Sequence, residues 1–120
     1  MAGVKFEVPA KVAEAQKQLI EKIAKKGKIK AGVNEVTKAV ERGTAKLVVI
    51  AGDVSPPEIV MHLPIVCKEK NIPFSFVATK KELGAQAGLP VAAAAIAVLD
   101  EGEAKKELAE VAKKLEGLSG

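Results

Sequence analysis

Apolar residues recur along this chain at two different spacings, and the two spacings alternate. Residues 9–26 and 32–43 repeat apolar side chains every three or four positions, which predicts amphipathic helices that end near Gly27 and Gly43. The short segment between these helices suits a strand. Residues 45–51 form an almost continuous apolar run rich in β-branched side chains. Such a run predicts a central strand that is covered on both faces.

The second half of the chain alternates in the same way, and two capping boxes led by Ser or Thr mark helix starts. The predicted elements are a helix from residues 55–58 that is kinked or restarted at Pro64, a strand at 74–78, a helix from residues 79–82 to Gly88, a strand at 92–99 and a last helix after Gly102. The whole order predicts an α/β fold, with a four-stranded mixed sheet between helical layers. We expect one domain over residues 1–120, large enough for a hydrophobic core.

Composition and charge favour a polyanionic partner. The chain is 48% hydrophobic, which excludes a disordered protein, and its aromatic content of 2% excludes a sheet with an aromatic base-stacking surface. Residues 1–48 hold eleven Lys and Arg against five Asp and Glu, a net charge of +6, whereas residues 49–120 have a net charge of −2. A basic half suits nucleic acid, although a solvated lysine-rich surface would give the same numbers.

The single cysteine and the apolar runs indicate the compartment. Cys67 has no partner for an intrachain disulfide, which fits a reducing environment. No apolar run reaches the roughly 18 residues of a membrane span, and the N-terminus does not resemble a signal peptide. We therefore expect a cytoplasmic monomer that does not bind membranes.

The helix at residues 32–43 has the most informative polar pattern. Asn34, Lys38 and Arg42 are spaced by four residues, so they line one exposed stripe. The two cations can neutralise phosphates, and Asn34 can donate and accept at a base edge. Glu35 would be repelled by phosphates, so in a nucleic-acid site it belongs where it accepts from base N–H groups. The structural alternative makes Asn34 an N-cap, Glu35 a partner of the helix dipole and the cations solvated.

A second candidate is the small apolar turn formed by Leu89, Pro90 and Val91, between Gly88 and the next strand. Such a turn should be partly exposed. It could simply pack onto the core. It could also support an extruded nucleotide, because single-stranded or bulged RNA exposes base faces that need dry contact.

Enzymatic interpretations are weaker. His62 and Cys67 have no carboxylate at an orienting spacing, so Cys67 is expected in the core and His62 partly buried with a satisfied ring. One His and one Cys cannot supply the usual metal ligands. Asp53 follows a strand, as catalytic acids often do, but no phosphate loop accompanies it, and the glycines of residues 84–88 end a helix. Asp53 is therefore interpreted as a turn former, and we expect no catalytic residue, metal or cofactor.

These segments together resemble a known family. Residues 32–43, 51–73, 79–84 and 88–89 are closely similar to the archaeal large-subunit ribosomal protein family L-seven-Ae, and the similarity extends over nearly the whole chain. The resemblance implies an α-β-α sandwich that binds the kink-turn, a helix–bulge–helix RNA element with tandem sheared G·A pairs. It also implies partners: ribosomal RNA, box C/D and H/ACA guide RNAs with their particle proteins, and ribonuclease P RNA in tRNA processing.

The same resemblance implies a role for each of nine residues. Asn34 and Glu35 would read the guanines of the sheared pairs, and Gly32 would allow close backbone approach. The phosphates would be held by Lys38, Arg42 and Lys80. The extruded nucleotide would be covered by Leu89, Pro90 and Val91. Two positions depart from the family pattern. Archaeal relatives often have Glu where this chain has Pro90, and the proline removes a backbone N–H. They more often have an acidic residue where this chain has Gly52.

Two other functions stay open. One is a related ribosomal protein of the L-thirty-e type with a different RNA target. The other is a small α/β enzyme, or the RNA-recognition half of a methyltransferase, which would need a second catalytic domain beyond Gly120. The RNA-binding interpretation expects a structural protein, which binds the bent form of its RNA better than the extended form and so shifts that equilibrium.

Overall fold

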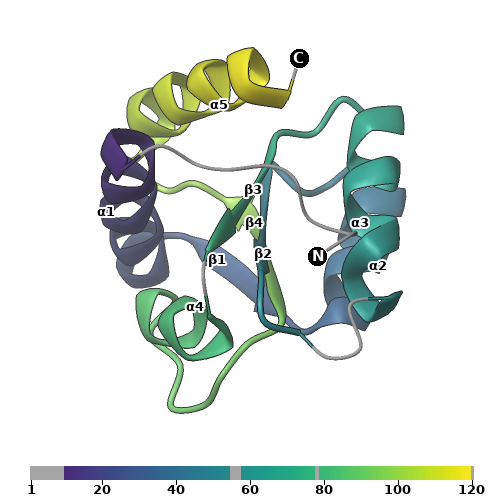
Figure 1. Cartoon of the computed structure of the whole chain (residues 1–120). Coiled ribbons are helices and arrows are strands. Elements are labelled where there is room, and N and C mark those ends of the chain that lie inside the picture. The colour runs from purple at the N-terminus through teal and green to yellow at the C-terminus, as the bar shows by residue number, and fades with distance from the viewer. Residues whose placement is uncertain (1–9, 55–57, 78, 120) are drawn as a thin grey trace.

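Helices and strands alternate in the order predicted from the hydrophobic pattern. The computed structural model describes residues 10–54, 58–77 and 79–119 (Figure 1). Its elements are α1 Ala10–Lys26, β1 Lys28–Ala31, α2 Val33–Glu41, β2 Leu47–Ala51, α3 Glu58–Glu69, β3 Phe74–Val77, α4 Lys80–Gln86, β4 Ala95–Asp100 and α5 Lys105–Ser119. Pro9 and most of the first capping box, residues 55–57, lie outside the described residues.

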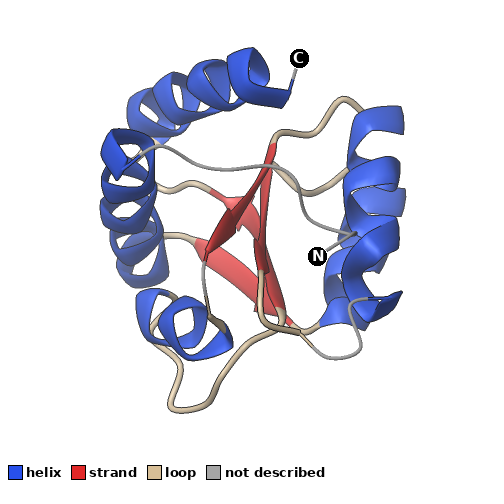
Figure 2. Ribbon diagram, in the orientation of Figure 1, coloured by secondary structure: helices blue, strands red, loops and turns tan. Residues whose placement is uncertain are grey.

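The four strands form one mixed sheet with the order β1-β4-β2-β3. β4 is antiparallel to both β1 and β2, and β2 is parallel to β3. All five residues of β2 are buried, which confirms the predicted central strand. Helices α1, α4 and α5 cover one face of the sheet, and α2 and α3 cover the other (Figures 1 and 2). The expected three-layer α-β-α sandwich is therefore confirmed.

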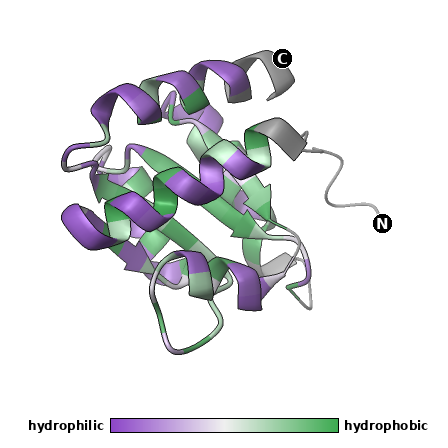
Figure 3. Ribbon diagram, turned by 90° about the vertical axis from the view of Figure 1, so that its left-hand side faces the viewer, coloured by the Kyte–Doolittle hydropathy of each residue, from purple (hydrophilic) through white to green (hydrophobic). Residues whose placement is uncertain are grey.

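Apolar side chains from both helical layers meet the sheet. Leu19, Ile20 and Ile23 of α1 are buried on one side. Val36 and Val40 of α2 are fully buried on the other, as their spacing predicted. Figure 3 shows hydrophilic and hydrophobic segments alternating along α1, whereas the strands behind it are mostly hydrophobic. Within the described residues, no helix is both long enough and apolar enough to cross a membrane.

The predicted start of β4 was wrong, and one of the two alternatives at Pro64, a restart of the helix, was also wrong. β4 begins at Ala95, three residues later than predicted, because the Ala93 N–H donates to the carbonyl oxygen of Lys80 in α4 (3.1 Å) and not to a neighbouring strand. The run of small apolar residues before β4 therefore belongs to a connection. α3 continues without a restart through Pro64, which lies inside the helix. Proline removes one helical hydrogen bond but does not end the helix here.

Candidate nucleic-acid interface

Segments that are far apart in the sequence meet at one end of the sheet, the lower end in Figure 1. The N–H of Gly32, after β1, donates to the carbonyl oxygen of Ala95 at the start of β4 (2.9 Å). The N–H of Gly52, after β2, donates to the carbonyl oxygen of Val77 at the end of β3 (2.8 Å). These bonds bring together the start of α2, the turn after β2, the start of α4 and the connection into β4. We call this part of the molecule the gathered end of the sheet.

α2 begins with a glycine cap. Gly32 has φ 101°, which favours glycine, and its carbonyl oxygen accepts from the N–H of Val36 (2.9 Å). No side chain caps this helix end. Asn34 is therefore the second residue of the helix and not its N-cap, so the structural alternative for Asn34 is wrong. No heavy atom outside the neighbouring residues lies within 4 Å of a Cβ built on Gly32, so the surface around this glycine is open.

The polar stripe divides into two parts. Asn34, Glu35 and Lys38 are exposed on the first two turns of α2. Arg42 is also exposed, but it is the C-cap residue, roughly 12 Å along the helix axis from Asn34. There its charge also suits the negative end of the helix dipole. The structure therefore brings Asn34, Glu35 and Lys38 together at the gathered end of the sheet and leaves Arg42 apart.

The start of α4 is held by two capping interactions. Thr79 is the N-cap, and its hydroxyl oxygen accepts from the N–H of Glu82 (3.1 Å), as the second capping box predicted. The carboxylate of Asp53, which lies in the turn after β2, accepts from the N–H of Lys80 (2.8 Å). These bonds hold the exposed Lys80 at the gathered end of the sheet. The Asp53 contact spans 27 residues, so no local motif could have predicted its partner.

The apolar turn before β4 is partly exposed, as predicted. Leu89 packs against the core, whereas Pro90 is exposed and Val91 is 66% exposed. Pro90 has no backbone N–H, and N–H groups on either side of it hold the turn. The N–H of Leu89 donates to the carbonyl oxygen of Gly84 (2.9 Å), and that of Ala93 reaches α4 as described above.

Gly84 allows α4 and this turn to touch. A Cβ built at Gly84 would lie 2.1 Å from the carbonyl oxygen of Val91 and 3.1 Å from Cα of Ala92. Both are backbone atoms, so no side-chain movement could make room. The signal in the sequence is the glycine itself: a glycine inside a helix costs about 1 kcal/mol relative to alanine, so it usually has a packing reason.

Comparison with known proteins identifies the family. Residues 14–109 match the family model described as "Ribosomal protein L7Ae/L30e/S12e/Gadd45 family". The chain belongs to this family. Among solved structures it is similar to the "15.5kD RNA binding protein" of Giardia lamblia, with a TM-score of 0.82 and 32% sequence identity. That match covers 97% of this chain and 96% of the other.

Membership of the L7Ae/L30e family and the RNA-binding neighbour indicate a non-enzymatic protein. Cys67 and His62, the two residues considered above for nucleophilic chemistry, both lie in the packed part of the fold. Cys67 is fully buried, and burial raises the pKa of its thiol to about 12, so the thiol is protonated near neutral pH. His62 is half-buried, and its Nε2 lies 2.8 Å from the hydroxyl oxygen of Thr37. The described residues include no cluster of three or more His, Cys, Asp or Glu side chains suited to a metal ion.

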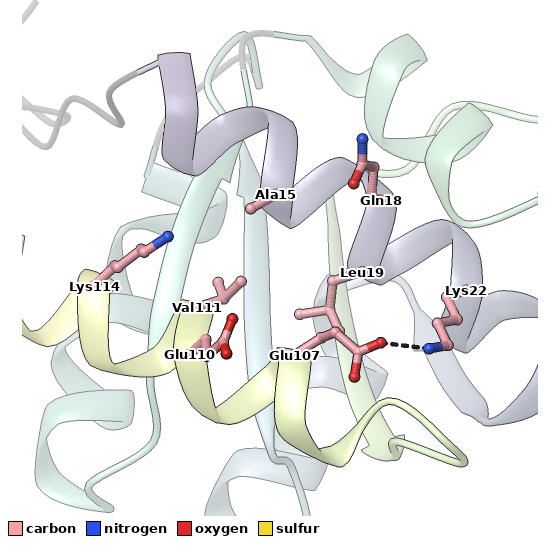
Figure 4. A pocket seen from close by; sticks show the side chains of 8 residues that line it. All are labelled: Ala15, Gln18, Leu19, Lys22, Glu107, Glu110, Val111 and Lys114. Atoms are coloured by element: carbon pink, nitrogen blue, oxygen red, sulfur yellow. Dashed lines mark hydrogen bonds and ion pairs between the residues drawn. The ribbon is translucent and has the colours of Figure 1, made fainter.

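A separate hollow of about 270 Å³ lies between α1 and α5 (Figure 4). Leu19 and Val111 form part of its lining, and the Lys22 ammonium forms an ion pair with the Glu107 carboxylate across the two helices. The hydrogen bond from Lys22 holds the pKa of Glu107 below its usual value. The hollow is on the face of the sheet opposite α2, so it is not part of the candidate interface.

Proposed function

We propose that this protein binds kink-turn RNA and stabilises its bent form. Membership of the L7Ae/L30e family and the similarity to an RNA-binding protein support RNA as the partner. One observation favours base recognition: Asn34 and Glu35 are exposed in the first turn of a helix whose cap is a glycine, so neither side chain is used to cap it. Both are free to contact a partner.

The chemistry of this turn fits guanine edges. The Glu35 carboxylate can accept from the N–H groups of a guanine, and Asn34 can donate and accept at once. The first N–H groups of α2 have no helical partners and lie at the positive end of the helix dipole, which favours electron-rich groups nearby. The open surface at Gly32 lets an RNA backbone approach the main chain.

The flanking residues fit the rest of a bent RNA. Lys38 and Lys80 would hold phosphates on either side of the recognised bases, and Arg42 would reach a phosphate further along α2. Leu89, Pro90 and Val91 would cover a nucleotide that leaves the stack, since they offer an apolar surface beside the cationic one.

The proposed mechanism is a shift between RNA conformations. A protein that contacts both strands at a sharp bend binds the bent form more tightly than the extended form. It can shift the equilibrium by no more than this difference in affinity. The candidate RNAs are ribosomal RNA, box C/D and H/ACA guide RNAs and ribonuclease P RNA, and guide-RNA particle proteins would then assemble on the folded RNA.

Three substitutions test the division of roles. Asn34→Ala and Glu35→Ala should each cost roughly 1–3 kcal/mol in binding to a kink-turn and little in binding to a plain duplex. Lys38→Ala should weaken both and reduce the salt dependence of binding. Lys105→Ala is the matched control, since Lys105 is exposed at the start of α5 in the opposite helical layer. Equal losses on both RNAs for all three variants would refute the proposal.

The family description also includes the L30e type, so a second RNA target is a specific alternative. A panel containing a kink-turn and versions without the tandem G·A pairs separates the two. Binding that depends on the G·A pairs supports the kink-turn. Binding that ignores them, with preference for a different internal loop, favours the alternative.

A further inference from the structure

A short chain of hydrogen bonds joins α3 to the first turn of α2. The hydroxyl oxygen of Thr37 lies 2.8 Å from the carbonyl oxygen of Val33 and 2.8 Å from Nε2 of His62. Thr37 and His62 are both half-buried. Val33 is the first residue of α2 and directly precedes Asn34. The chain therefore ends at the turn that displays the proposed base-reading residues.

Counting protons assigns the direction of these bonds. A threonine hydroxyl has one proton, and a carbonyl oxygen can only accept. If the hydroxyl donated to His62, two oxygen atoms without a proton between them would face each other at 2.8 Å. The hydroxyl must therefore donate to Val33, and Nε2 of His62 must be protonated and donate to Thr37. This geometry assigns the Nε2–H form to the ring.

We propose that His62 is a positioning residue for RNA recognition, which acts through the Thr37 hydroxyl to orient the turn of α2 that holds Asn34 and Glu35. The role rests on the proposed function. His62 does not need to touch RNA itself. It directs a hydrogen bond from α3 across to α2, whereas the buried apolar side chains of the two helices, such as Val36 and Leu63, supply packing that has no preferred direction.

The first turn of α2 has reason to need this support. Its cap is a glycine with positive φ and no side-chain bond, so the usual polar restraint at a helix start is absent. Val36 and Val40 anchor the helix to the core but lie further along it. Binding groups must be held to within about 0.5 Å by supporting interactions if they are to match a rigid partner. A hydrogen bond that ends on Val33 supplies this restraint next to Asn34.

A double-mutant cycle measures the effect. Thr37→Val keeps the side-chain size and removes the hydroxyl, and we expect threefold to tenfold weaker binding to a kink-turn. His62→Phe should weaken binding by a similar factor, and the double variant should bind no more weakly than the weaker single variant, because both break the same chain. Thr37→Ser retains the hydroxyl and should bind like the unmodified protein.

Two further readouts separate positioning from general damage. Binding to an RNA without the G·A pairs, and the salt dependence of binding, should stay unchanged in Thr37→Val, because the phosphate-binding lysines are not displaced. In the unmodified protein, nitrogen-15 NMR of the imidazole should show a proton on Nε2 and none on Nδ1 at a pH where the ring is neutral. This measurement needs no variant and applies even if Thr37→Val fails to fold.

Several results would overturn the inference. A neutral ring protonated at Nδ1 contradicts the proton assignment. Unchanged kink-turn affinity in Thr37→Val, or losses that multiply in the double variant, contradict the positioning role while leaving the proposed function intact. If the unmodified protein does not distinguish a kink-turn from the RNA without G·A pairs, the proposed function itself fails, and the positioning role fails with it.

Discussion

Replacing Gly84 by alanine sets two effects of opposite sign against each other. On an exposed helix surface, Gly→Ala should stabilise the protein by about 1 kcal/mol through helix propensity. In α4, the new Cβ would lie 2.1 Å from the carbonyl oxygen of Val91, so the turn before β4 must shift. Overpacking against backbone costs about 1–3 kcal/mol. The movement also strains the bonds from the N–H groups of Leu89 and Ala93, each worth about 1 kcal/mol.

The expected net result is that Gly84→Ala lowers the free energy of unfolding by roughly 1–3 kcal/mol. Urea unfolding followed by circular dichroism measures this as a lower midpoint with an unchanged slope. Ala85→Gly is the matched control, because Ala85 is the next residue of α4 and is exposed. It should cost about 1 kcal/mol by propensity alone. Stabilisation by Gly84→Ala would refute the close contact between α4 and the turn.

Three other predictions concern stability and titration. Thr79→Ala should cost about 1 kcal/mol in urea unfolding, because it removes the α4 cap, and an unchanged midpoint would contradict this. Burial raises the pKa of Cys67 to about 12, so the protonated thiol contributes stability that is present below about pH 9 and is lost as pH rises from about 9 towards 12. The free energy of unfolding should therefore fall less steeply with alkaline pH in Cys67→Ala than in the unmodified protein. Lys22→Gln should raise the pKa of Glu107 in an NMR titration, since Lys22 holds it low; an unmoved pKa would exclude that cause.

Local patterns predicted the elements whose burial follows from a regular period. The five consecutive apolar residues of β2, several of them β-branched, predicted a strand buried on both faces, and β2 is one of the two interior strands. The spacing of Val36, Ala39 and Val40 predicted the buried side of α2. The stripe on α2 followed from the same period, which placed Asn34 and Lys38 on the exposed side.

Contacts between distant segments could not be predicted in this way. The hydrogen bonds between Asp53 and Lys80 and between Thr37 and His62 join residues 27 and 25 positions apart, and they depend on how the layers pack. The N-cap of α2 was ambiguous because glycine and asparagine both suit a helix start. The hydrogen bond from the N–H of Val36 to the carbonyl oxygen of Gly32 identifies the glycine as the cap, and its positive φ is a property of the folded connection between β1 and α2.

The central claim is that Glu35 accepts hydrogen bonds from a guanine of the sheared pairs. It is tested most directly by combining Glu35→Ala with an RNA in which that guanosine is replaced by inosine, which lacks the exocyclic amino group. With the unmodified protein, the inosine replacement should cost roughly 1–3 kcal/mol of binding free energy. With Glu35→Ala, the same replacement should cost clearly less, because the Glu35 contact is already gone and only the pairing role of the amino group is lost. An inosine penalty of equal size in both proteins would contradict the account.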